Sequence, residues 1–100
     1  MNRYRLTIRR RVADLDGWRQ TIERRAEMLR AGGATGYTLS RVVDDHNETE
    51  LVLHFDRRED AEAMARQLDL PENRETVLQA GAMEIGSMWL AEELASDRWA

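Results

Sequence analysis

The stretch Gly32–Asp56, GGATGYTLSRVVDDHNETELVLHFD, decides the fold of this 100-residue chain. Its first half, Gly36–Val43, has the composition of a strand and follows glycines that end a helical pattern. Its second half, Glu50–Phe55, alternates leucine and phenylalanine with valine and histidine, which is typical of a strand. Residues 44–49 between them are polar turn formers. The sequence therefore predicts a β-hairpin that the rest of the chain covers or extends.

One strand and one helix are predicted before the hairpin. The strand has a period of two, and its buried face comprises Tyr4, Leu6, Ile8 and Val12. The helix begins after Asp14 or Asp16, whose carboxylates can accept from its first amides, and it ends near Arg30. Its apolar stripe comprises Leu15, Trp18, Ile22, Ala26 and Leu29. That spacing predicts an amphipathic helix packed on the sheet.

Two further helices and a strand are predicted after the hairpin. The first helix, Arg57–Leu68, has Asp56 as its candidate cap. Pro71 ends that helical pattern and begins a short helix that continues through Glu72–Gln79. The last strand is predicted over Met83–Leu90.

The order strand, helix, strand, strand, helix, strand predicts an α+β fold of the ferredoxin-like βαββαβ type with an antiparallel sheet. Residues 1–94 would form this single domain and residues 95–100 a C-terminal tail. With the helices on one face of the sheet, the other face needs a cover. We expect that face to hold Val42, Val52, Met88 and Leu90. This apolar content predicts a homodimer that pairs through the sheet faces.

The composition excludes several classes of function. Without cysteine there is no disulfide, thiolate nucleophile or cysteine-held iron–sulfur cluster, and without lysine there is no lysine Schiff base. The formal net charge is −4 and Arg9-Arg10-Arg11 is the only basic run, so we expect no nucleic-acid partner. There is no long apolar run and no signal-peptide centre near the N-terminus. We therefore expect a cytoplasmic protein without a membrane partner.

Four segments of the chain carry a resemblance to a known family. They are the Gly-x-x-Gly-Tyr turn at Gly33–Tyr37, the strand end at Arg41–Asp45, the aromatic strand end at Phe55, and the acidic, alanine-rich helix start at Glu59–Ala63. This pattern resembles the dimeric α/β-barrel superfamily, which includes the antibiotic-biosynthesis monooxygenases. The later segment Leu70–Ala82 is similar to members labelled cyclase.

The resemblance implies a homodimer whose sheets stack face to face. It also implies a small-molecule enzyme similar to cofactor-free monooxygenases or cyclases, acting on an apolar substrate such as an aromatic or polyketide-like compound. Monooxygenase members often carry a histidine inside the second helix, whereas Ala61–Ala65 contains none. A second hypothesis therefore stays open: a non-catalytic ligand-binding or structural homodimer of the same fold.

Three residues are candidates for catalysis. His54 can titrate near neutral pH and act as a base, and its plainer alternative is a hydrogen-bonded position inside the dimer barrel. Tyr37 brings a hydroxyl that can orient a phenol or a carbonyl. Arg41 can anchor an anion or pair with Glu50 across the hairpin.

The ligand-binding candidates are Trp18, Ile22, Tyr4 and Trp89. We expect Trp18 and Tyr37 to flank a cleft between the first helix and the sheet, where this superfamily places its ligand cavities. Core packing is the alternative for Trp18. Neither His46 nor His54 has a second ligand at metal-binding spacing, so we expect no metal and no other cofactor. Haem held by one histidine is an alternative that the sequence leaves open.

Overall fold

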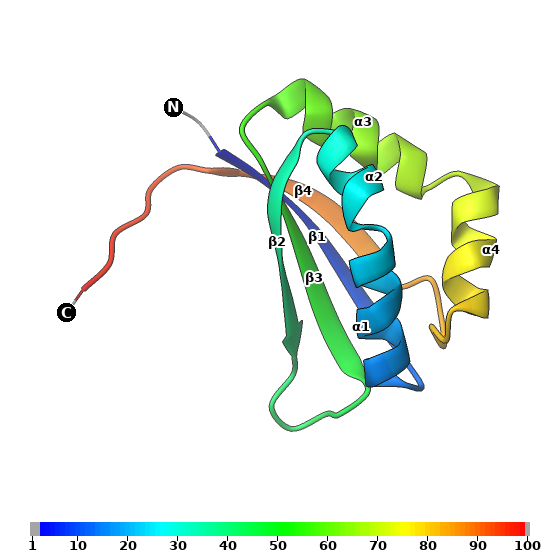
Figure 1. Cartoon of the computed structure of the whole chain (residues 1–100). Helices are drawn as coiled ribbons and strands as arrows, with labels where there is room; N and C mark the ends of the chain where they lie inside the picture. Colours follow the sequence, from blue (N-terminus) through cyan, green and yellow to red (C-terminus); the bar gives the residue numbers. More distant parts are fainter. Residues whose placement is uncertain (1–2, 100) are drawn as a thin grey trace.

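The predicted hairpin is present in the computed structural model, which describes residues 3–99 (Figure 1). Its strands are β2 (Ala34–Arg41) and β3 (Glu48–Phe55), which pair antiparallel. The turn closes through the N–H of Val42, which donates to the carbonyl of Glu48 at 2.9 Å. Both strands begin two residues earlier than the sequence predicts, because backbone pairing extends beyond the apolar alternation at each start.

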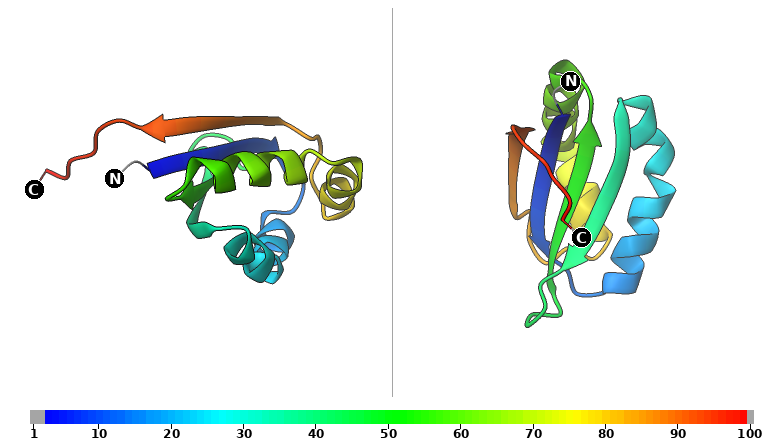
Figure 2. Two further views of the ribbon diagram at one scale, coloured as in Figure 1. Left: turned by 90° about the horizontal axis from the view of Figure 1, so that it is seen from above. Right: turned by 90° about the vertical axis from the view of Figure 1, so that its left-hand side faces the viewer.

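The hairpin belongs to a four-stranded antiparallel sheet with the strand order β2-β3-β1-β4. Strand β1 is Arg3–Arg11 and β4 is Ser87–Glu93. The helices are α1 (Leu15–Arg24), α2 (Ala26–Ala31), α3 (Arg58–Leu68) and α4 (Pro71–Gln79). Figure 2 shows these helices on one side of the sheet. This is the α+β, ferredoxin-like fold that the order of elements predicts.

The single helix predicted up to Arg30 is two helices that meet at Arg25. The backbone of Arg25 leaves helical geometry, with φ −92° and ψ 0°. Its N–H is shared between the carbonyls of Thr21 and Ile22. The side chain of Arg25 forms a hydrogen bond with α4, so this break becomes part of the candidate site.

Neither long helix is capped as the sequence predicts. Asp14 occupies the N-cap position of α1 but makes no side-chain cap hydrogen bond. The N-cap of α3 is Arg57 rather than Asp56. The first turns still carry acidic residues, Asp16 in α1 and Glu59 in α3, which suit the positive end of a helix dipole. Favourable charge thus takes the place of the expected cap hydrogen bonds.

The last strand starts and ends later than predicted, at Ser87–Glu93 instead of Met83–Leu90. Before it, Ala82 forms an isolated bridge with Val12. The residues between that bridge and β4 leave the ladder, and Gly86 brings the chain back to β1 with a φ of 78°. A Cβ at Gly86 would lie 2.0 Å from a backbone oxygen of β1. This close crossing, invisible in the apolar pattern, moves the strand along the chain.

Pairing with β1 decides which face of the sheet each residue of β4 occupies. Leu90 lies opposite Leu6 and Met88 lies opposite Ile8. Both pack against the core beneath the helices. The expectation that Met88 and Leu90 lie on the open face is therefore wrong, because cross-strand partners share a face. Trp89 takes the open face instead.

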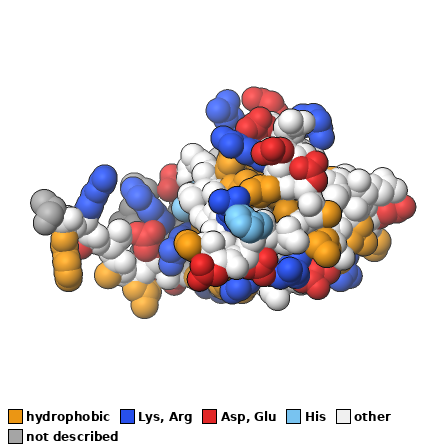
Figure 3. Space-filling model, turned by 90° about the horizontal axis from the view of Figure 1, so that it is seen from below, with side chains coloured by type: hydrophobic (Ala, Val, Ile, Leu, Met, Phe, Trp, Pro, Cys, Tyr) orange, Lys and Arg blue, Asp and Glu red, His pale blue; other side chains and the backbone are white. Residues whose placement is uncertain are grey.

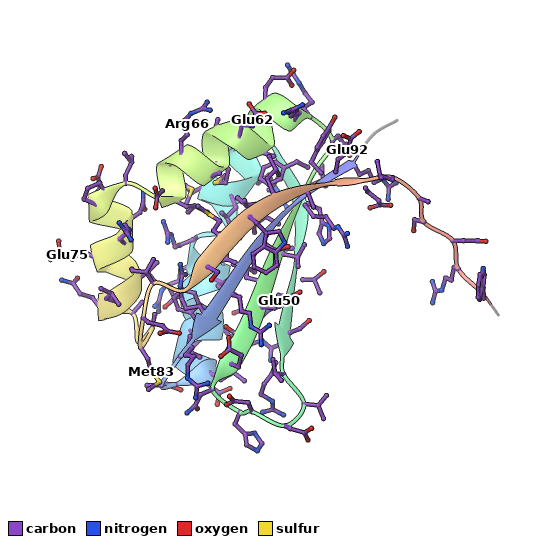
Figure 4. All side chains as sticks on the ribbon, turned by 180° about the vertical axis from the view of Figure 1, so that it is seen from behind. Glu50, Glu62, Arg66, Glu75, Met83 and Glu92 are labelled. Atoms are coloured by element: carbon purple, nitrogen blue, oxygen red, sulfur yellow. The ribbon has the colours of Figure 1, made fainter. Side chains whose placement is uncertain are left out.

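The open face of the sheet, which lies away from the helices, is largely polar (Figure 4). Arg9 pairs there with Glu48 at 3.0 Å, and Arg11 bonds to the same carboxylate at 3.2 Å. Val52 and Trp89 add apolar surface to this face. The face is thus a mixed polar and apolar surface, to which Trp89, rather than Met88 and Leu90, contributes the apolar part from β4.

Charged side chains of both signs are interleaved over the end of the molecule seen in Figure 3. The helices repeat this pattern, since Arg58 pairs with Glu62 and Arg19 with Glu23 across one helical turn. No helix within residues 3–99 is long and apolar enough to cross a membrane.

Candidate functional site

A cavity of about 290 Å³ lies between the sheet and the helices α1, α2 and α4. Its apolar walls include Ile8, Trp18, Ile22, Leu53, Val77 and Met88. The polar side chains that reach it are Arg10, Thr21, Arg25, Asp69 and Arg74. A concave, mostly apolar space with a few polar groups is the usual form of a small-molecule site.

Two sequence periodicities build this cavity. Trp18 and Ile22 are one helical turn apart on α1 and face the sheet, and only 3% of Trp18 is exposed. Ile8 and Arg10 are two residues apart on β1, so they share the face beneath the helices. The guanidinium carbon of Arg10 consequently lies 5.3 Å from the centroid of the Trp18 ring, within the range of a cation–π contact.

Arg10 carries a partly desolvated positive charge. Its Nε donates to the carbonyl of Ile85 at 2.8 Å. Burial, and then the charge of Arg25, lower the pKa of Arg10 to about 10. Within residues 3–99, no carboxylate lies within 4 Å of its guanidinium group. Burying a charge without a counter-ion costs free energy, so the positive charge of Arg10 is unfavourable at this position.

Arg25 reaches the same cavity from the break between α1 and α2. Its Nη2 donates to Oδ1 of Asn73 on α4 at 2.7 Å, and Nδ2 of Asn73 donates to the carbonyl of Gln67 at 2.6 Å. Burial lowers the pKa of Arg25. Its partner is neutral, as is the partner of Arg10, so neither charge is offset by a described carboxylate.

Asp69 and Arg74 lie at the rim of the cavity, where α3 gives way to α4. The Nε of Arg74 is 4.0 Å from Oδ1 of Asp69, and both side chains are exposed. Asp69 is the one carboxylate among the described residues that line the cavity. In the part of the chain that the structure describes, no group of three or more His, Asp or Glu side chains could hold a metal ion. Because Arg10 and Arg25 reach the interior of the cavity while Asp69 lies at its exposed rim, that interior is electropositive.

The structure brings two of the predicted ligand-binding residues, Trp18 and Ile22, into this cavity. Tyr37 and Arg41 line a separate surface groove beside α1, which Ile22 also borders. Because β2 is an edge strand, Tyr37 is left 41% exposed. Trp18 and Tyr37 therefore border different spaces rather than one shared cleft.

The other predicted site residues lie away from the cavity. His54 is on the open face of the sheet, with its Nε2 3.1 Å from Oγ1 of Thr38. Trp89 is on the same face and is 46% exposed. Tyr4 faces the helices and packs half-buried against the core, but it does not line the cavity. The sheet itself separates His54 and Trp89 from the space beside Trp18.

Sequence reasoning missed Arg10 and Arg25, the two partly buried arginines of the cavity. For Arg10 there is a signal, because it occupies the inward position of the period-two pattern between Ile8 and Val12. Arginine is rarely buried unless it is paired, so a cation at such a position marks a candidate site. For Arg25 there is no local signal, because its direction depends on the helix break and on α4.

Known proteins match this chain through structure rather than sequence. No family model and no curated protein matches it. A candidate antibiotic biosynthesis monooxygenase from Bordetella bronchiseptica superposes with a TM-score of 0.69 at 15% identity, covering 96% of this chain and 99% of that one. SnoaB, a cofactor-independent oxygenase from Streptomyces nogalater, superposes with a TM-score of 0.62 at 17% identity, covering 98% of this chain and 97% of that one. A dimeric ferredoxin-like protein from an uncultured marine organism superposes with a TM-score of 0.61 at 12% identity, covering 99% of this chain and 100% of that one.

These likenesses run from end to end of each chain and concern the path of the backbone. They agree with the strand order and with the position of the helices on one face of the sheet. The protein therefore shares the ferredoxin-like fold of these proteins, the fold that the resemblance of Gly32–Asp56 implied.

Proposed function

We propose that the protein is a homodimeric small-molecule enzyme of the monooxygenase-like or cyclase-like kind, whose apolar substrate binds in the cavity beside Trp18. The observation that carries this proposal is the cavity of about 290 Å³, which combines apolar walls with a few inward-facing polar groups. Its volume is at the low end for ligand sites, which favours a substrate of one or two rings. The cofactor-independent oxygenase SnoaB shares the fold and supports the reaction class.

We assign the substrate to this cavity rather than to the groove of Tyr37 and Arg41. That groove is also lined by Asp16, Arg19 and Ser40, which are exposed and hydrated, so an apolar ring would lose little contact with water there. In the cavity, a ring would contact the buried side chains of Trp18 and Ile22. Burial of this apolar surface would be the main source of affinity.

The test is calorimetric titration with 1-naphthol, a neutral two-ring probe. Wild-type protein should bind one molecule per chain with saturation. Met88→Trp adds bulk to the cavity wall without touching the groove of Tyr37 and Arg41 and should abolish binding, whereas Gln20→Trp, on the exposed side of α1, should leave it intact. Circular dichroism confirms that both variants are folded. Absence of saturable binding, or equal binding by both variants, would contradict the assignment.

A non-catalytic binding protein is the second candidate, and one observation favours it. No histidine lines the cavity within residues 3–99, and its one described carboxylate, Asp69, is at the exposed rim. The chain thus offers few groups that could move a proton. Incubation of ring compounds under ¹⁸O₂, followed by mass spectrometry, separates the candidates. An oxygenase incorporates label, a cyclase changes the compound without label, and a binding protein returns it unchanged.

We place the dimer interface on the open face of the sheet, and the dimeric ferredoxin-like proteins that share the fold support the dimer itself. Trp89 and Val52 supply apolar surface there, and His54 with its hydroxyl partner Thr38 would lie inside the interface. This assigns His54 a hydrogen-bonding role between subunits rather than a catalytic one.

Sedimentation equilibrium tests the dimer. Wild-type protein should have twice the mass of one chain, and Trp89→Arg should shift it toward monomer by burying an unpaired charge. Leu78→Arg is the matched control, because Leu78 on α4 is 45% exposed, close to the 46% of Trp89, but lies off the sheet. Equal effects of the two substitutions would place the interface elsewhere.

A further inference from the structure

Arg10 and Arg25, the two partly buried arginines of the cavity, point to the charge of its ligand. We infer that the ligand is a small aromatic carboxylate, whose anionic group binds between Arg10 and Arg25 while its ring packs among the apolar walls. This inference rests on the proposed function and narrows its substrate class.

The first argument is the absence of a protein counter-ion. The chain contains 19 acidic residues, and many of them form ion pairs with surface arginines, as in the pairs Arg9–Glu48 and Arg58–Glu62. Arg10 and Arg25 instead have neutral partners within residues 3–99, a carbonyl for Arg10 and an amide for Arg25. Asp69, the one described carboxylate that lines the cavity, lies at the exposed rim beside Arg74 and not within 4 Å of Arg10 or Arg25. The positive charge of these two arginines is therefore left to be met from outside the chain.

The second argument is the unused hydrogen-bonding capacity. A guanidinium group has five N–H donors. In the described part of the chain, Arg10 uses Nε toward Ile85, and Arg25 uses Nη2 toward Asn73. The Nη groups of Arg10, and Nε and Nη1 of Arg25, donate to no side chain or backbone acceptor among residues 3–99. Two oxygens of a carboxylate fit such planar donors in a bidentate manner.

The third argument is electrostatic. Burial lowers the pKa of both side chains, and the charge of Arg25 lowers that of Arg10 further. The Arg10 cation is therefore disfavoured by burial and by repulsion from Arg25, and the Arg25 cation is disfavoured by burial. A bound anion would remove that repulsion and stabilise both charged forms. The same cavity would not offer this gain to a neutral ring.

The shape of the site favours a carboxylate on a ring over a phosphate ester. The guanidinium groups lie beside apolar walls formed by Ile22, Leu53 and Met88, so the anion has to be joined to an apolar body. A phosphate group would carry more charge and retain more hydration than this space satisfies. Inorganic phosphate is accordingly a direct test of the alternative source of anionic charge.

The experiment compares 2-naphthoate with its neutral analogue 2-naphthamide by titration calorimetry. Wild-type protein should prefer the carboxylate. Arg10→Gln and Arg25→Gln should each weaken naphthoate binding roughly ten- to a hundredfold, the range for a hydrogen bond to a charged group, and leave naphthamide binding unchanged. Arg9→Gln is the matched control, because Arg9 is the neighbour of Arg10 on the opposite face of β1.

Three results would overturn the inference. Equal affinity for naphthoate and naphthamide while 1-naphthol still binds would refute the anion site and leave the proposed function standing. Unchanged naphthoate binding by Arg10→Gln and Arg25→Gln would place the anion elsewhere. Competition by inorganic phosphate at concentrations where acetate has no effect would reassign the site to phosphate compounds. If Arg10→Gln does not fold, Arg25→Gln alone decides the second result, and failure of every ring compound to bind contradicts both proposals.

Discussion

Replacement of Gly86 by alanine tests how the last strand is positioned. Gly86 has a φ of 78° and lies where β4 returns to β1 after the bridge at Ala82. A Cβ there would be 2.0 Å from the carbonyl oxygen of Arg9 and 3.1 Å from Cα of Arg10. The clash is with backbone, which cannot rotate aside as a flexible side chain would. The substitution should therefore shift Ile85, whose carbonyl holds Arg10 in the cavity.

The size of the effect follows from two contributions. A non-glycine residue in the left-handed region costs about 1–2 kcal/mol. Overpacking against a fixed backbone costs a further amount of about 1–3 kcal/mol. We expect Gly86→Ala to lower the free energy of unfolding by about 2–5 kcal/mol in total. That is a large fraction of the stability of a domain of this size, which is about 5–15 kcal/mol.

Two other glycines separate these contributions. Gly81 has a φ of 106° with no atom within 4 Å of a Cβ, so Gly81→Ala should cost only the backbone part, about 1–2 kcal/mol. Gly36 has neither feature, and Gly36→Ala should change stability by less than about 0.5 kcal/mol. Urea denaturation of the three variants gives the comparison. Equal costs for Gly86→Ala and Gly81→Ala would refute the close crossing.

Three further substitutions test the core, a buried hydrogen bond and an ion pair. Met64→Ala removes a buried side chain under the sheet and should cost about 2–5 kcal/mol in urea denaturation, and a cost below 1 kcal/mol would mean that Met64 is not packed as described. Thr49→Val removes the hydroxyl that donates to the carbonyl of Arg10 at 2.8 Å and should cost about 1–3 kcal/mol, with no loss contradicting that bond. Asp45→Asn removes a carboxylate whose pKa is lowered from 3.8 by its hydrogen bond to Arg11. A lowered pKa contributes stability above 3.8 that is lost as the pH falls through the folded-state value, so the melting temperatures of wild type and variant should differ at neutral pH and converge in acid. A difference that does not depend on pH would rule out the ion pair as its source.

Much of the fold could be predicted because it depends on local pattern. The alternation in Glu50–Phe55, the helical stripe with Trp18 and Ile22, and Pro71 at the start of α4 each favour one local structure, and each is present. The register of β4 could not be predicted in this way. Both faces of Met83–Leu90 carry apolar residues, so alternation does not say which face is inward.

Only part of the candidate site could be predicted from the sequence. Trp18 and Ile22, two of the residues predicted to bind a ligand, line the cavity because both belong to a strong helical stripe. The side-chain chemistry of His54 and Trp89 makes them candidates for the site, yet the sheet separates them from the cavity. The reason is that the chemical type of a side chain does not reveal which face of a two-layer structure it occupies.

The sequence by itself determined the order of the elements, the antiparallel hairpin and the amphipathic helices, since each depends on residues close together in the chain. Only the tertiary structure decided that Arg10 and Arg25 face one cavity. Arg10 comes from the floor of the sheet, whereas Arg25 is directed by a helix break and by Asn73, 48 residues further along the chain. The proximity of these two side chains depends on how the helices pack on the sheet. Contacts between residues so far apart in the chain produce no periodic pattern in the sequence.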